Sequence, residues 1–467
     1  MSTDICYWSA IETAKWLRER EVSVLEVTDA HLARLDALNP ALNAVVQSMN
    51  GAREQAKAMD AQGPQLGQPL WGVPITIKIN IDQAGTANSN GLSAFADNIS
   101  TEDSPVVRNL SRAGALTIGR TNTPEFSMRW FSSNALHGVT QNPWGHNKTP
   151  GGSSGGAAAA VASGIGCLAH GNDLGGSLRY PAFCCGVASI RPSMGRVPAF
   201  TPSAPKERPS ITQSMSVQGP IARSVADVRF GLQIMAQRDA RDPLWRNTPN
   251  SGRSHNKPWT IGVATNPYGG NVDPAIEDAM AKAVDAARAA GAKVVEITPP
   301  MAIEIAKIWG DLLATEVHHT MGSAIRDFAS PTQATAIEAI FERSQLLDTA
   351  GLLESMARRL TAQRAWGLMF DEIDALVMPT SLQRPFENDW DLGTHDHHAA
   401  ILEAQQPLVS INMLGLPSVA IPTHLADGVP VGVQVIGALD DDYLVLDVAE
   451  AMEAHLGTLW QQLPANR

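Results

Sequence analysis

The chain has 467 residues, 44% of them hydrophobic, and its 35 lysines and arginines against 47 aspartates and glutamates give a formal net charge of −12. This length can bury a large core, either as one large domain or as two to three domains of average size. The negative charge argues against nucleic acid or an anionic membrane as the main partner.

The beginning of the chain, MSTDICYWSAIETAKWLRER, has no uninterrupted apolar stretch behind a positive start. No apolar run elsewhere reaches the ~18 residues of a membrane span. We therefore expect a cytoplasmic protein without a membrane segment. The four cysteines, at positions 6, 167, 184 and 185, are too few and too irregularly spaced for a disulfide framework or a zinc site. We expect them to be reduced and buried.

In the first half of the chain, apolar patterns typical of helices and of strands follow one another. Leucines and valines at helical spacing predict a helix from Val24 that stops at Asn39-Pro40. Strict alternation predicts a strand over 73–80, with isoleucines on one face and Lys78 on the other. A helix over 104–113 precedes an apolar strand over 115–118, an order typical of an α/β sheet.

The second half continues the α/β pattern around two less regular regions. Residues 198–258 are polar and punctuated by prolines, and residues 302–370 are mostly helical. The other predicted elements are a helix over 272–289, strands over 293–297, 374–378, 418–423 and 431–438, and a helix over 442–455. No repeat or low-complexity linker marks a boundary. We predict one α/β domain over residues 1–467, with a more variable, largely helical, substrate-facing excursion at about 198–400.

Two glycine-rich clusters carry serines, PGGSSGG at 150–156 and DLGGSLRYP at 173–181. Adjacent glycines let backbone N–H groups approach a reacting atom, although either cluster alone is typical of an ordinary turn. PGGSSGG also fits the nucleophile-elbow pattern G-x-S-x-G, centred on Ser153 or Ser154. That elbow needs a preceding strand, whereas NPWGHNKTP is loop-like. A P-loop is excluded because no Gly-Lys-Ser/Thr follows.

Histidines offer two other kinds of site. The run HDHH at 395–398 could suggest a metal site, but no ligand spacing on a helix or strand accompanies it. We expect a solvated loop there and no metal. His137 and His170 could serve as the base of a serine–histidine dyad. Because a lysine is already available, we expect both to be structural.

The serine clusters and their surroundings resemble the amidase signature family. Its hallmark is a GGSSGG block followed by a D-x-GGS-x-R-x-PA stretch that ends in CG, and here the block runs PGGSSGGAAAAVASGIGCLAHGNDLGGSLRYPAFCCGV. GVPITIKIN is similar to the family's lysine strand, and GRTNTPEF, NPW, INMLGLPSVAIP and GVPVGVQVIG resemble its other segments in the same order. The resemblance covers nearly the whole chain. It implies the amidase signature fold, an α/β fold whose large mixed central sheet is covered by helices on both faces.

The resemblance also implies a catalytic set. Lys78 is the general base, Ser153 is a bridging serine that follows a cis peptide bond, and Ser177 is the nucleophile. A serine hydroxyl needs an adjacent proton acceptor, and a lysine can serve only where burial keeps it neutral. The apolar strand around Lys78 predicts such burial.

Backbone N–H groups of the second cluster form the oxyanion hole that the resemblance implies, namely those of Leu174, Gly175, Gly176 and Ser177. Asp173 and Arg179 are expected to pair and brace this loop. The family frequently has threonine where this chain has Leu174, and commonly aspartate where it has Ile79. Both departures leave the catalytic set intact and indicate a subgroup with its own substrate.

The implied activity is hydrolysis of a carboxylic amide to an acid and ammonia or an amine through a serine acyl-enzyme, without a cofactor. Three alternatives remain: the A subunit of a tRNA-dependent amidotransferase, a Ser-His-Asp esterase on an α/β-hydrolase fold, and a non-catalytic scaffold.

The substrate is expected to be a small molecule. The stretch SMRWF favours an aryl or medium apolar amide over glutamine. By position, Ser127, Met128 and Trp130 line the acyl pocket, with further contacts near Trp309 and Leu312. A homodimer is compatible with the sequence.

Overall fold

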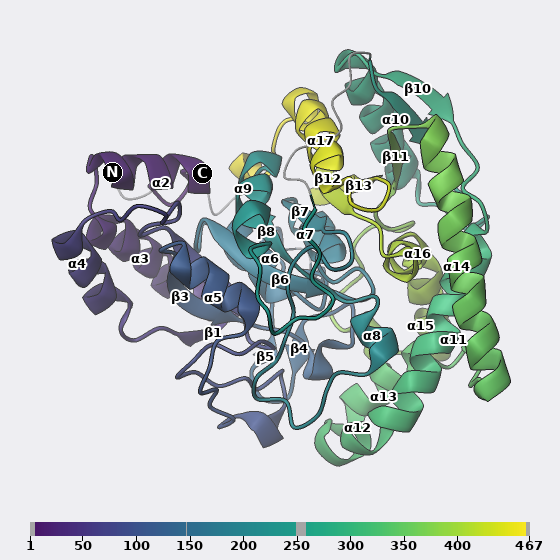
Figure 1. The fold of residues 1–467 in the computed structure, drawn as a ribbon, viewed down its shortest axis with the longest axis horizontal. Coiled ribbons are helices and arrows are strands. Elements are labelled where there is room, and N and C mark those ends of the chain that lie inside the picture. The colour runs from purple at the N-terminus through teal and green to yellow at the C-terminus, as the bar shows by residue number, and fades with distance from the viewer. Residues whose placement is uncertain (1–4, 146, 249–257, 464–467) are drawn as a thin grey trace.

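A long mixed sheet runs through the protein, whose computed structural model describes residues 5–145, 147–248 and 258–463. Eleven strands of these residues pair in the order β1-β3-β2-β6-β8-β7-β12-β13-β11-β9-β10 (Figure 1). They are β1 (Val45–Ser48), β2 (Pro74–Lys78), β3 (Leu116–Thr121), β6 (Leu168–Asp173), β7 (Ala188–Arg191), β8 (Val217–Ala222), β9 (Thr260–Val263), β10 (Lys293–Glu296), β11 (Ala375–Pro379), β12 (Ser418–Ala426) and β13 (Val429–Ile436). A separate pair is formed by β4 (Ser133–Asn134) and β5 (Gly138–Val139).

Strand β2 lies inside the sheet, parallel to β3 on one side and to β6 on the other. All of its residues are buried, as expected for an interior parallel strand that is covered on both faces. From β6 through β8, β7, β12, β13 and β11 each pairing is antiparallel. The last strands, β11, β9 and β10, pair in parallel. The sheet is therefore mixed, as the resemblance implied.

The α-helices of the described residues account for most of the remaining chain. They are α2 (Ala10–Glu19), α3 (Val24–Leu42), α4 (Ala52–Gln62), α5 (Pro105–Arg112), α6 (Gly155–Ala162), α7 (Arg179–Cys185), α8 (Ser210–Gln213), α9 (Val225–Met235), α10 (Pro274–Ala289), α11 (Ala302–Thr320), α12 (Gly322–Phe328), α13 (Pro331–Ile340), α14 (Thr349–Glu372), α15 (His395–Ala404), α16 (Gln406–Leu414) and α17 (Asp442–Leu456). Short 3-10 helices are η1 (Ser93–Phe95), η2 (Glu125–Ser127), η3 (Trp390–Leu392) and η4 (Trp460–Gln462). Helix α14 forms one edge of the molecule in Figure 1.

Helices cover both faces of the sheet. On β6, Leu168 contacts Gly231 of α9, whereas Ser154 and Leu178, which precede α6 and α7, lie against Gly171. Because positions on a strand alternate between its two faces, Leu168 and Gly171 belong to opposite faces. Helix α9 therefore lies on one face and contacts α17, which contacts α10, while α6 and α7 contact each other on the other face.

Helix α3 extends further than the sequence predicted. It continues through Pro40 and ends at Leu42 instead of stopping at Asn39-Pro40. Pro40 lies in the last turn, where its missing N–H removes one helical hydrogen bond, and the helix ends two residues later. The side chain of Asn39 then accepts hydrogen bonds from the N–H groups of Ala44 and Val45, which ends the helix and begins β1.

Residues 198–400 contain more β-strands than their polar, proline-rich and helical segments predict. Strand β8 lies in the middle of the sheet, although its sequence VQGPIA contains the Gly219-Pro220 pair that is atypical of interior strands. Strand β9, from the same range, was not predicted either, whereas β10 and β11 correspond to the strands expected over 293–297 and 374–378. The longest run of helices in this range extends from α11 to α14, at the lower and right side of Figure 1, and is called the helical excursion below.

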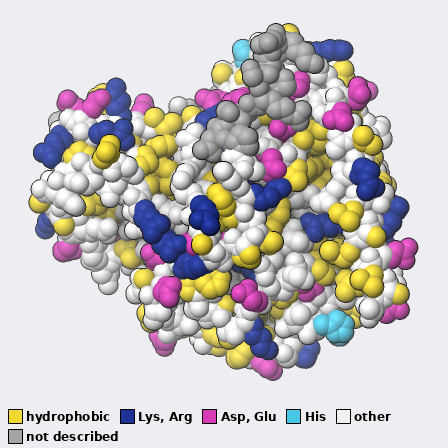
Figure 2. Space-filling model, viewed as in Figure 1, with side chains coloured by type: hydrophobic (Ala, Val, Ile, Leu, Met, Phe, Trp, Pro, Cys, Tyr) yellow, Lys and Arg dark blue, Asp and Glu magenta, His cyan; other side chains and the backbone are white. Residues whose placement is uncertain are grey.

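The prediction for the cysteines is confirmed, since all four are buried with free thiols. No helix within the described ranges combines the length and the apolar character that a membrane crossing needs. On the face shown in Figure 2, lysines and arginines are interspersed with aspartates and glutamates rather than gathered into one basic field.

Candidate active site

Lys78 is the last residue of β2, and its side chain is fully buried. Its Nζ lies 2.7 Å from Oγ of Ser153, 3.1 Å from Oγ of Ser154 and 2.7 Å from Oδ1 of Asn172. The strand order explains why Asn172 lies next to Lys78: β2 pairs with β6, and Asn172 is the second-last residue of β6. Lys78 thus forms one polar cluster with Ser153 and Ser154, which are distant from it in the sequence.

Burial lowers the pKa of Lys78 well below its usual value, and the carboxylate of Asp173 opposes this shift only in part. A desolvated ammonium is costly, so the neutral amine gains in population. No carboxylate is among the hydrogen-bond partners of Nζ in the described residues. Lys78 therefore has the environment of a proton acceptor.

The first serine cluster leads into α6. Ser153 and Ser154 are both buried, and Ser154 immediately precedes the helix. The peptide bond between Gly152 and Ser153 is cis, as the resemblance implied. At Gly152 a Cβ would stand 2.3 Å from the backbone nitrogen of Phe131, so only glycine fits this position.

Ser177 lies in the turn between β6 and α7 and is 8% exposed, more than Ser153 at 1%. Of the serines in the two clusters it is thus the most accessible. No hydrogen bond joins its hydroxyl to Ser153 in the described residues. The expected link between Lys78 and Ser153 is present, whereas the step from Ser153 to Ser177 stays a prediction.

Asp173 organises the turn that carries Ser177. Its Oδ1 accepts a hydrogen bond from the N–H of Gly176 at 2.8 Å, and its Oδ2 accepts one from the N–H of Leu178 at 3.1 Å. Gly176, which was expected to donate to an oxyanion, therefore donates within its own loop. The N–H groups of Leu174, Gly175 and Ser177 remain as the predicted donors to the oxyanion.

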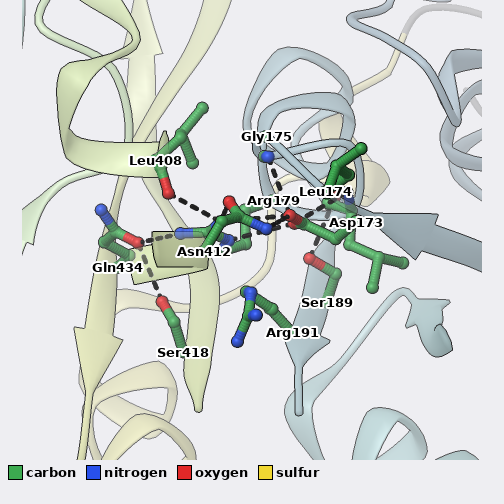
Figure 3. Close-up of polar contacts among 12 residues, drawn as sticks. Asp173, Leu174, Gly175, Arg179, Ser189, Arg191, Leu408, Asn412, Ser418 and Gln434 are labelled. Atoms are coloured by element: carbon green, nitrogen blue, oxygen red, sulfur yellow. Dashed lines mark hydrogen bonds and ion pairs between the residues drawn. The ribbon is translucent and has the colours of Figure 1, made fainter. Parts of the chain in front are cut away.

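Arg179 joins this turn to the C-terminal part of the chain, as Figure 3 shows. It forms a fully buried ion pair with Asp173 at 3.1 Å. On its other side it donates to Oδ1 of Asn412 at 2.7 Å and to Oε1 of Gln434 at 2.8 Å. Asn412 in turn donates to Asp173 at 2.7 Å. The turn is thus tied to α16 and to β13.

The residues predicted to line the acyl pocket have different surroundings. Ser127 forms hydrogen bonds with two asparagine side chains. Its Oγ accepts one from Asn80 at 2.9 Å and donates one to Asn90 at 2.7 Å. Met128 packs against an apolar cluster of the excursion, which consists of Val317, Ile325 and Ile337. Trp130 is nearly buried, and its Nε1 donates to the carbonyl of Gly175 at 2.7 Å.

Sequence reasoning missed a pair of asparagines beside the lysine. The amide of Asn172 donates to Oδ1 of Asn80 at 3.0 Å, and Asn80 donates back at 3.3 Å. This pairing directs Oδ1 of Asn172 toward Lys78. Two signals were present in the sequence: Asn80 shares the strand face of Lys78, and Asn172 directly precedes Asp173.

The histidines lie outside this cluster. His170 is fully buried, burial lowers its pKa to about 3, and its Nε2 contacts Oε1 of Gln218 at 2.8 Å. The run at 395–398 is not a loop but the first turn of α15, where His397 stacks on Trp390 and His398 contacts the carbonyl of Asp391. The described residues hold no group of side chains suited to a metal ion.

A model of the Amidase family matches residues 26–446. The chain belongs to this family. Indoleacetamide hydrolase of Bradyrhizobium diazoefficiens is 42% identical over 98% of this chain and 88% of its own length. The A subunit of the glutamyl-tRNA(Gln) amidotransferase of Lawsonia intracellularis is 30% identical over 98% of this chain and 99% of its own length.

The fold agrees with this membership. The crystal structure of a bacterial aryl acylamidase of the amidase signature family superposes with a TM-score of 0.84 at 26% identity, covering 99% of each chain. As a member of this family, the protein is an amide hydrolase that acts on C–N bonds. The alternatives of an α/β-hydrolase esterase and a non-catalytic scaffold gain no support from these matches.

Proposed function

We propose that this protein hydrolyses the primary amide of an arylacetic acid, such as indoleacetamide, to the acid and ammonia. The observation that carries the proposal is the buried contact between Lys78 and Ser153, beside the turn that presents Ser177. The 42% identity to an indoleacetamide hydrolase supports the aryl substrate.

The three contacts of Lys78 assign a direction to the proton relay. A neutral amine has two N–H groups and one lone pair, and the Oδ1 atom of Asn172 can only accept. If Ser154 accepts the second N–H, the lone pair faces Ser153, whose hydroxyl then donates to it. Ser153 becomes able to accept a proton from Ser177 as it gives its own to Lys78.

In the proposed reaction, Oγ of Ser177 attacks the amide carbon while its proton passes through Ser153 to Lys78. Backbone N–H groups stabilise the oxyanion of the tetrahedral intermediate. The proton returns along the same path to the leaving nitrogen, so the C–N bond breaks and ammonia departs. Water then attacks the acyl-enzyme ester through the same relay, which releases the acid and restores Ser177.

The A subunit of an amidotransferase is the second candidate, favoured by the 30% identity to such a protein over almost the whole chain. Arg129, the basic residue of the SMRWF stretch, does not favour this candidate, because its guanidinium is buried in an ion pair with Asp389 at 2.9 Å and in a second one with Asp391. It is therefore occupied and not free to bind the carboxylate of glutamine.

We further propose that residues 1–467 form one domain and that the enzyme acts in the cytoplasm, without nucleic acid as a partner. The Arg179 network supports a single domain because it joins segments from both halves of the chain. The net charge of −12 supports the absence of a nucleic-acid partner. A homodimer remains a proposal that sedimentation can test.

The experiment is an ammonia-release assay with indoleacetamide, aryl and aliphatic amides, and glutamine. We expect the arylacetamides to give the highest kcat/KM and Lys78→Ala to abolish turnover. Retained activity in Lys78→Ala would indicate a different base and contradict the relay. Release of ammonia from glutamine only in the presence of a partner protein would identify a component of an amidotransferase instead.

A further inference from the structure

Two indole N–H groups hold the turn that carries Ser177. Nε1 of Trp309, on α11, donates to the carbonyl of Leu174 at 3.1 Å, and Nε1 of Trp130 donates to the carbonyl of Gly175 at 2.7 Å. Both side chains are 6% exposed. Their ring centroids are 6.3 Å apart, within the range of a direct aromatic contact. The two tryptophans therefore act on the turn as one unit.

The next carbonyl of the turn is also fixed, because that of Gly176 accepts from the N–H of Tyr180 at 2.8 Å. In a trans peptide the C=O and N–H groups point in opposite directions. Holding these consecutive carbonyls therefore sets the direction of the N–H groups of Gly175, Gly176 and Ser177. Gly176 donates to Asp173, which leaves Gly175 and Ser177 as the donors set by this anchoring.

Gly175 is matched to the indole that covers it. A Cβ at this position would stand 2.9 Å from Cζ2 of Trp309, closer than real Cβ contacts allow. The glycine thus permits the ring of Trp309 to approach the backbone closely enough to reach the carbonyl of Leu174. The contact between Trp309 and the turn therefore requires a glycine at position 175.

We propose that Trp309 and Trp130 are positioning residues of the oxyanion-binding turn. Trp309 fixes the peptide that presents the N–H of Gly175. Trp130 fixes the next peptide, which connects Gly175 to the peptide of Ser177 that Tyr180 holds. This inference rests on the proposed role of Ser177 as the nucleophile. Donors stabilise an oxyanion most when they are fixed before the charge develops, and the loss of one donor typically costs about 10² to 10³ in rate. Through Trp309, the helical excursion is coupled to the catalytic turn.

The variants Trp309→Phe and Trp130→Phe test the proposal, because phenylalanine keeps an aromatic ring but lacks the N–H. Trp366→Phe is the matched control: its Nε1 donates to the carbonyl of Pro300 at 2.8 Å, and its side chain is fully buried on α14. We expect kcat to fall roughly 10- to 100-fold in the first two variants, with KM changed less than about threefold. The control should change neither constant more than about twofold.

A trifluoromethyl ketone that carries the acyl group of the best substrate gives a second measurement, since it forms a tetrahedral adduct with a serine. Its inhibition constant should rise in Trp309→Phe and Trp130→Phe by the same factor by which kcat/KM falls. A merely structural role does not produce this proportionality.

Two outcomes overturn the inference. The first is a kcat in both variants equal to that of the control, and the second is a rise in KM with kcat unchanged, which would make the indoles substrate contacts. A different variant tests the proposed function, so its failure can be distinguished from failure of the positioning role. If Ser177→Ala retains the turnover of the wild type, the nucleophile is wrong, whereas loss of turnover in Ser177→Ala with full activity in Trp309→Phe rejects only the positioning role.

Discussion

Lys78 is suited to accept a proton because none of its hydrogen-bond partners in the described residues carries a charge. Its partners are two serine hydroxyls and the amide of Asn172, and this chain has Ile79 where the family commonly places an aspartate. Burial lowers the pKa of Lys78, and a carboxylate in contact would reverse much of that shift. The amide oxygen of Asn172 orients the amine without adding a charge.

Asn172→Asp tests this explanation through the pH dependence of kcat/KM. A general base is inactive while protonated, so activity falls below its pKa. A negative charge beside the ammonium raises the pKa of Lys78, and the acid limb of the profile therefore moves to higher pH, by about one unit or more. Asn388→Asp adds the same charge near the surface and should leave the limb in place. An unshifted limb in Asn172→Asp would mean that Lys78 does not set it.

Asp173→Asn is predicted to destabilise the protein. Burial alone would raise the pKa of Asp173, but the Arg179 guanidinium outweighs it and holds the pKa well below its usual range. Removing one member of a buried ion pair costs about 3 to 5 kcal/mol. The carboxylate stabilises the fold above the ordinary aspartate pKa, and this contribution is lost as the pH falls through the lowered value.

Urea unfolding at neutral pH measures this loss. Asp285→Asn, which removes an aspartate that is 80% exposed on α10, is the matched control and should change the free energy of unfolding by less than about 0.5 kcal/mol. Equal stability of Asp173→Asn and the control would contradict the bracing role of the ion pair.

At the scale of elements, the start of α9 depends on a carboxyl group of another helix. Both oxygens of Glu453, on α17, accept hydrogen bonds from the N–H of Val225, at 3.1 and 3.0 Å. Burial raises the pKa of Glu453 to about 7, and the hydrogen bond from Val225 offsets only part of this rise. The two helices that cover one face of the sheet are thus joined by a group that titrates near neutral pH.

Glu453→Gln reveals this titration as a change in stability with pH. Because the folded pKa lies above the unfolded value, the folded state holds the proton more tightly, and the wild type loses stability as the pH rises from about 5 to about 8. The glutamine variant does not titrate, so the wild type should lose about 2 to 3 kcal/mol relative to it over this range. Thermal unfolding across pH measures the difference. A stability difference between Glu453→Gln and the wild type that stays constant across this pH range would refute the assignment.

At the scale of the whole molecule, the order of strands interleaves distant parts of the sequence. The C-terminal strands β12 and β13 lie between β7 and β11, and β1 and β10 lie at the two edges. No segment of the described sheet can separate without exposing interior strands. We therefore predict a single cooperative transition in calorimetry, with equal van't Hoff and calorimetric enthalpies. Two resolved transitions, or the survival of a folded core after removal of residues 415–467, would contradict a single domain.

The sequence predicted six of the eleven strands in the described sheet, namely β2, β3, β10, β11, β12 and β13, and the resemblance implied the cluster around Lys78. The strand β2 was predictable because its alternation is strict, and the contact of Lys78 with Ser153 followed from the resemblance. Strand β8 was missed because Gly219 and Pro220 hide its apolar pattern. The asparagine pair and the anchoring of the turn by Trp309 could not be predicted, since they depend on side chains that the fold brings together from distant segments.

The identity of the nucleophile is the central claim, and trapping the acyl-enzyme tests it most directly. The enzyme is mixed with an activated arylacetic ester, quenched in acid within one turnover, cleaved before Asp173 with an aspartate-specific protease, which separates Ser177 from Ser153 and Ser154, and measured by mass spectrometry. We predict that the acyl mass appears on the peptide that contains Ser177 and is absent in Ser177→Ala. An acyl group on the peptide of Ser153 and Ser154, or turnover without any acylated peptide, would contradict the account.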